Sequence, residues 1–183
     1  MNSLGKEYLE TVITRVKYYK HLAEQAFDQL EEKDFHFAPS SESNSIAVII
    51  QHMSGNMLSR WTNFLTEDGE KEWRERDGEF VIHDYDRKKL LEIWQQGWDC
   101  FLGALQLLQE SDLLKTVYIR KEPLTVIDAI NRQLAHYPHH IGQILYVGKL
   151  VRNEEWKNLS ISKGKSADYN KSDAVKDPAK KYR

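Results

Sequence analysis

The chain has 183 residues, of which 30% are charged and 40% are hydrophobic, and its formal net charge at neutral pH is −2. This length predicts one domain that buries a core without disulfides or a structural metal. The near-neutral charge argues against a nucleic-acid partner, and no apolar run is long enough to span a bilayer. Because the start, MNSLGKEYLE, is unlike a signal peptide and Cys100 is the single cysteine, we expect a cytoplasmic location.

Apolar residues at steps of three and four predict four helices. The first covers residues 4–31, and the second covers about residues 45–65 with Ser45 as its N-cap. The third begins near Asp86, and the fourth follows Thr125. Each predicted helix carries one apolar stripe, so the sequence indicates an all-α protein.

A connection of about twenty residues, TEDGEKEWRERDGEFVIHDYD, separates the second and third predicted helices and is too long for a tight turn. If this crossover runs the length of the domain, the second and third helices are parallel. We therefore predict a four-helix bundle in up-down-down-up order. The stretches EFVIH and TVYIR are expected to be extended at most, without forming a sheet.

Residues 1–160 are predicted to form the bundle, and residues 161–183 a polar C-terminal tail. The tail is rich in Lys, Ser and Asp and lacks apolar periodicity, so we expect it to be irregular or partly disordered. Cys100 falls near the apolar edge of the third helix and is predicted to be a buried core residue.

Two histidines of the fourth helix, His136 and His140 in AHYPHHIGQI, have the spacing of metal ligands. Residues four apart share a helix face, with Cβ atoms roughly 5–6 Å apart, so two nitrogens can converge on one ion at about 2.0–2.1 Å. His52, in the second helix, supplies a third ligand if the two helices pack side by side. All three lie toward the edge of the apolar faces, which suits a site with open coordination positions. The spacing alone also fits ordinary helix histidines that bond to neighbours or water.

Pro138 lies between the two ligands, where it removes a hydrogen bond and collides with the carbonyl of Leu134. We therefore expect a kink or break, which is either tolerated at the pocket rim or re-aims His140. His139 is also within reach of an i, i+3 pair with His136, but its helical phase points away from the apolar face. His140 is therefore the predicted ligand, and His139 is expected to be solvated.

Asn56 lies one turn beyond His52, and Gln143 one turn beyond His140. Both amides are candidates for orienting a ligand or a bound substrate, although exposed amides on helices are common. No glutamate adjoins the histidines as in a His-Glu-x-x-His helix. A zinc-protease interpretation is therefore disfavoured, and no general base is apparent.

The order of elements, the lone histidine of the second helix, the His-x-x-x-His pattern before Ile-Gly-Gln-Ile, and the strings ESNSIAVIIQH, GNMLSRW and SISKGKS resemble the DinB-like superfamily. The similarity is to a bacterial branch of uncharacterised function and covers roughly residues 1–168. It implies an up-down-down-up four-helix bundle in which His52, His136 and His140 bind a divalent metal, usually zinc or nickel.

Because some members of that superfamily transfer low-molecular-weight thiols, the resemblance implies a metal-dependent S-transferase in which the metal activates a thiol. A metal-dependent hydrolase using metal-bound water is an alternative. A second class is a non-enzymatic, stress-associated binding or self-associating helical protein in which the metal is incidental or absent. A homodimer is expected for either class. A small-molecule substrate is the expected partner, with neither nucleic acid nor membrane.

Overall fold

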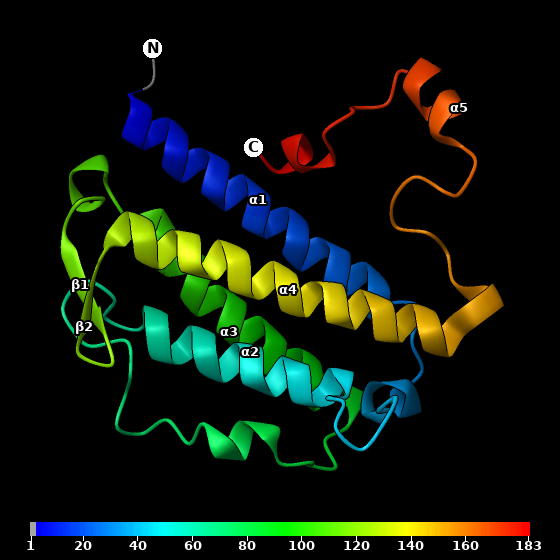
Figure 1. Cartoon of the computed structure of the whole chain (residues 1–183), viewed down its shortest axis with the longest axis horizontal. Helices are drawn as coiled ribbons and strands as arrows, with labels where there is room; N and C mark the ends of the chain where they lie inside the picture. The colour runs from blue at the N-terminus through cyan, green and yellow to red at the C-terminus, as the bar shows by residue number, and fades with distance from the viewer. Residues whose placement is uncertain (1–2) are drawn as a thin grey trace.

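A computed structural model describes residues 3–183, which are mostly helical (Figure 1). Within these residues the long α-helices are α1 (Leu4–Phe27), α2 (Ile46–Trp61), α3 (Arg87–Leu107) and α4 (Val126–Arg152). Helix α2 packs against α3 and α4, and α1 packs against α4 and α3. The all-α class is therefore confirmed.

The second, third and fourth helices begin where the sequence predicts them. The side chains of Ser45, Asp86 and Thr125 each accept a hydrogen bond from the backbone N–H three residues later, at 3.3, 2.7 and 3.2 Å. The first helix ends four residues earlier than predicted, at Phe27. Just beyond that end, the Asp34 carboxylate accepts a hydrogen bond from the Glu31 N–H at 2.8 Å, in place of a backbone carbonyl of the helix. A short 3₁₀ helix, Glu32–His36, follows.

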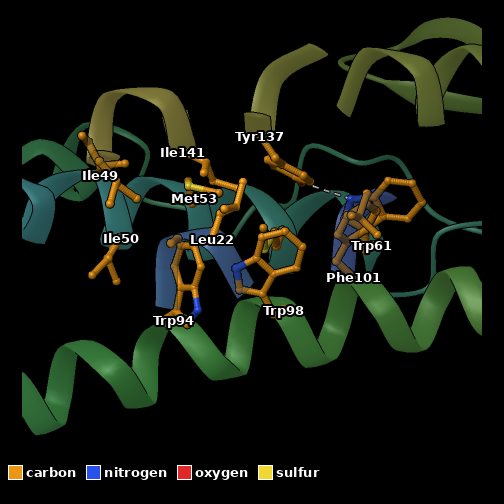
Figure 2. Packing of buried hydrophobic residues seen from close by; sticks show 14 of the residues in the cluster. Leu22, Ile49, Ile50, Met53, Trp61, Trp94, Trp98, Phe101, Tyr137 and Ile141 are labelled. Carbon is orange, nitrogen blue, oxygen red and sulfur yellow. Dashed lines mark hydrogen bonds between the residues drawn. The ribbon is translucent and has the colours of Figure 1, made fainter. Parts of the chain in front are cut away.

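The core is rich in aromatic side chains from α2, α3 and α4 (Figure 2). Tyr137 is fully buried, accepts a hydrogen bond from Trp61 Nε1 at 3.1 Å and donates one to Asn56 Oδ1 at 3.0 Å. Figure 2 shows Tyr137 reaching from α4 toward Trp61 of α2. Cys100, predicted to be buried, is half-buried against this core. These contacts fix the register of α4 against α2, and thereby position the histidines.

The expectation that no sheet forms is wrong, since β1 (Thr116–Ile119) pairs antiparallel with β2 (Glu122–Thr125). Their turn is Arg120–Lys121, with φ angles of 58° and 64°. A two-residue turn of this kind is normally signalled by Asn-Gly, which this sequence lacks. Asp68 holds the turn by accepting the N–H groups of Arg120 and Lys121 at 2.8 and 2.7 Å.

The long connection, residues 62–86, leaves α2 near the hairpin and passes back along the helices to α3 (Figure 1). It contains a short 3₁₀ helix, Asp77–Phe80, that packs against α2. The tail expected to be irregular contains α5 (Ser166–Lys171) and a 3₁₀ helix, Pro178–Tyr182, that packs against α1. No helix in residues 3–183 has the length and apolar character needed to cross a membrane.

Candidate metal centre

The three predicted histidines come together between α2 and α4. One ligand nitrogen from each of His52, His136 and His140 lies within 4.8 Å of the others. The Nε2 atoms of His136 and His140 are 3.0 Å apart, and the His52 ring lies 5.6 and 4.9 Å from their ring centres. His52 is buried and the other two are half-buried, so the group is reachable from the surface.

Helix α4 runs through Pro138 without interruption, and the predicted break is absent. Buried side chains anchor the helix on both sides of the proline, including Ile130, Tyr137 and Ile141, each 0% exposed. This packing outweighs the local preference of proline to end a helix. His136 and His140 therefore remain on one face, whereas His139 is exposed.

Glu79, on the connection between α2 and α3, orients the ring of His52. Its Oε2 lies 2.9 Å from His52 Nδ1, and its side chain is only 9% exposed. Arg74 holds the same carboxylate through Nε at 2.7 Å and Nη2 at 2.9 Å. Burial would raise the pKa of Glu79, but the hydrogen bonds from His52 and Arg74 lower it below its ordinary value. An ionised carboxylate only accepts, so His52 Nδ1 carries the hydrogen, and in the neutral ring Nε2 is the nitrogen with the free lone pair.

Two amides act in the same way on α4. Gln143 Oε1 lies 2.7 Å from His140 Nδ1, and Gln133 Oε1 lies 3.3 Å from His136 Nδ1. When both Nδ1 atoms carry the hydrogen, the tautomer that the Gln133 and Gln143 oxygens favour, the two Nε2 lone pairs face each other at 3.0 Å, and a cation between them removes their repulsion. Two nitrogens bound to one tetrahedral zinc at about 2.0–2.1 Å are roughly 3.3 Å apart. These three histidines therefore fit a divalent metal ion.

The protonation state of the α4 histidines also suits a metal. Burial, reinforced by the neighbouring His140 and His52, lowers the pKa of His136 to about 3. Burial also lowers the pKa of His140. Both rings are neutral at neutral pH, which is the form that binds metals.

Glu79 is the site residue that the sequence analysis missed. The signal that could have found it is Gly55, one turn beyond His52 in the middle of α2. A Cβ at Gly55 would lie 2.7 Å from the carboxyl carbon of Glu79, too close for ordinary contact. An interior helix glycine costs about 1 kcal/mol relative to alanine, so it indicates that another group approaches the backbone there.

The predicted amides occupy different places. Gln143 contacts His140 directly, whereas Asn56 accepts the hydrogen bond of Tyr137. Asn56 lines a cavity of about 220 Å³ together with His52, Gln133 and His136.

A second cavity, of about 500 Å³, is lined by Ile49, Gln143 and Val147 among others. His52 and His136 line the smaller cavity, whereas the larger one is lined by Gln143, which contacts His140.

Residues 3–165 match a family described as a protein of unknown function, DUF1572. No curated protein and no solved structure matches the chain. The matched range includes the three histidines and Glu79, but the family's description names no activity, so function must be argued from the site. The chain belongs to the DUF1572 family of proteins of unknown function.

Proposed function

We propose that this protein is a metal-dependent enzyme in which His52, His136 and His140 hold one divalent ion and a low-molecular-weight thiol is activated for transfer. The observation that carries the proposal is the use of all three Nδ1 atoms in outward hydrogen bonds, which leaves three Nε2 atoms for a metal. Among residues 3–183 no fourth His, Cys, Asp or Glu joins the group. Three protein ligands leave a position for an exogenous group, as in catalytic rather than structural sites.

The proposal includes membership of the DinB-like superfamily and its up-down-down-up bundle. It is supported by the packing of the long helices, in which α1 contacts α4, α4 contacts α2, α2 contacts α3 and α3 contacts α1. The long α2–α3 connection also supports it. Zinc or nickel is the proposed metal, since imidazole nitrogens suit both.

A divalent ion at this site would lower the pKa of a coordinated thiol and so favour thiolate at neutral pH. In the transfer, the thiol gives its proton to solvent and its sulfur forms a bond to an electrophilic carbon of the acceptor. The leaving group departs from that carbon with the bonding electrons. Glu79 and Gln143 keep the imidazole rings oriented throughout. The cavity lined by His52 and His136 and the one lined by Gln143 offer room for the thiol and its acceptor.

A conjugation assay tests this reaction. Bacillithiol, glutathione and related thiols would each be mixed with a fluorogenic alkylating agent and metal-loaded protein, with chelated protein and the His140→Ala variant as controls. We expect conjugation with at least one thiol, and only with metal present. If no thiol gives metal-dependent conjugation, the transferase proposal is wrong, and hydrolysis or a non-enzymatic, self-associating role becomes the better account.

We further propose a cytoplasmic homodimer that acts on small molecules and binds neither nucleic acid nor membranes. Two exposed apolar side chains one turn apart on α4, Tyr146 and Leu150, support a self-association surface. Light scattering on the purified protein tests the dimer, and a monomer at all concentrations would contradict it.

A further inference from the structure

The smaller cavity beside the histidines is unusually basic. Five arginines line it, contributed by α2, the α2–α3 connection, the hairpin turn and α4: Arg60, Arg74, Arg76, Arg120 and Arg132. No carboxylate of the described residues lines it. Cationic side chains from four separate segments therefore converge on one small space next to the proposed metal ligands.

The carboxylates around this arginine pocket are fewer than its cations. Glu70 is shared, since it pairs with Arg60 at 2.9 Å and with Arg120 at 3.0 Å. The side chain of Arg132 makes no hydrogen bond or ion pair with residues 3–183. Among the described residues the ion-pair partner of Arg76 is the fully exposed Asp77, at 3.9 Å, and its guanidinium also lies over the Phe80 ring. Positive charge therefore remains available at the pocket.

Arg74 gives an independent indication of an absent acceptor. Its side chain is only 2% exposed, and its Nη1 is buried with no hydrogen-bond partner. The carboxylate of Glu70 is 4.0 Å from that nitrogen, beyond hydrogen-bond distance. A buried charged donor without a partner is unfavourable, so an acceptor bound in the pocket beside Arg74 would stabilise it.

The conformation of the hairpin turn places Arg120 at the pocket. Arg120 and Lys121 both have positive φ, a conformation that side chains other than glycine adopt only when the surroundings impose it. Asp68 imposes it by accepting both backbone N–H groups, and Glu70 then receives Arg120 Nε at 3.0 Å.

The size of the pocket limits what it holds. A volume of about 220 Å³ is below the roughly 300–1,000 Å³ of sites that enclose whole small molecules, so it suits one group of a larger substrate. Guanidinium groups match planar carboxylates and tetrahedral phosphates through paired hydrogen bonds. His52 and His136 form part of the same wall.

We propose that the arginine pocket binds an oxyanion group of the substrate, a carboxylate or a phosphate, and so places the substrate's reacting group at the three histidines. The assignment to a substrate rests on the proposed function, whereas the binding of an oxyanion does not. The thiol or its acceptor is therefore an anionic molecule, with its charged group a short distance from the atom that reacts.

Calorimetric titration with inorganic phosphate and, separately, with succinate tests the pocket. Each anion would be titrated into chelated protein, so that no metal can bind it directly, and then into metal-loaded protein. The test variant is Arg76→Gln with Arg132→Gln, because both side chains are exposed and their loss leaves the buried ion pairs intact. The matched control is Arg15→Gln with Arg183→Gln, which also removes two arginine charges, at exposed positions where Arg15 pairs with Asp177 and Arg183 pairs with Glu7.

We expect at least one anion to bind chelated protein, with affinity at least about tenfold weaker in the double variant and changed less than about twofold in the control. Binding of phosphate alone would indicate a phosphorylated substrate, and binding of succinate alone a carboxylate-bearing one. If neither anion binds, or if the double variant binds as tightly as the parent, the proposal is wrong. If the protein binds an anion but no metal, the proposed function is wrong and the anion-binding pocket is supported. If it binds metal but no anion, the pocket proposal is wrong and the proposed function is unaffected.

Discussion

Replacing Gly55 with alanine is expected to stabilise helix α2 and, at the same time, to weaken metal binding at the site. The added Cβ would lie 2.7 Å from the carboxyl carbon of Glu79, whereas ordinary contact begins near 3.4 Å. Because Glu79 Oε1 lies closer still, the carboxylate must retreat by at least about 0.7 Å, which lengthens its 2.9 Å bond to His52 to about 3.6 Å or more, outside hydrogen-bond range. Loss of a partner that orients a metal-binding histidine weakens metal affinity by about 10–100-fold, or about 1.4–2.7 kcal/mol.

The same substitution favours the helix itself by about 1 kcal/mol, because alanine loses less backbone entropy than glycine. We therefore expect Gly55→Ala to weaken the binding of zinc in a competition titration while the metal-free protein stays folded. Gly103→Ala is the matched control, since a Cβ there meets nothing within 4 Å. Zinc affinity in Gly55→Ala within twofold of the parent and of Gly103→Ala would refute the reasoning that Glu79 supports His52 through this contact.

The remaining predictions concern the histidines and their surroundings. Glu79→Gln should weaken zinc binding by about 10–100-fold, whereas Glu72→Gln, the same change at an exposed position of the connection, should not alter it; equal effects would show that the loss is only one of net charge. His139→Ala should leave metal affinity nearly unchanged, and His140→Ala should reduce it by at least about tenfold. The opposite result in the same titration would identify His139 as the ligand in place of His140. In chelated protein, the pKa of His136 is lowered from 6.5 to about 3, so the unfolded chain binds the proton more tightly. The free energy of unfolding should therefore be highest above pH 6.5 and fall as the pH drops toward 3. Urea unfolding at several pH values measures it, and an equal dependence on pH in the parent and in a His136→Asn variant would contradict this.

Much of the helical scaffold could be predicted because its signals are local. The apolar periodicity and the caps Ser45, Asp86 and Thr125 each act within a few residues, and the helix starts follow them. The hairpin could not be predicted in this way. Its turn at Arg120 depends on Asp68, which lies 52 residues earlier in the chain, so the determinant is a tertiary contact.

Some residues of the candidate site could likewise be predicted from local spacing, whereas others depend on tertiary contacts. The spacing of His136 and His140 follows from helical geometry, and the packing of Tyr137 preserves it despite Pro138. Glu79 escaped because it lies on an irregular connection with no period to place it, 27 residues from its partner His52. The arginine pocket could not be predicted from the sequence either, because its side chains come from separate segments that only the fold brings together.

Metal analysis of protein purified without a histidine tag tests the central claim most directly. Inductively coupled plasma mass spectrometry would compare the parent with a variant in which His52, His136 and His140 are all alanine, after both are incubated with zinc or nickel and desalted. The grouping of one nitrogen from each histidine within 4.8 Å predicts about one ion per chain in the parent and almost none in the variant. Equal metal content in the two proteins would contradict the assignment of these histidines as the metal site.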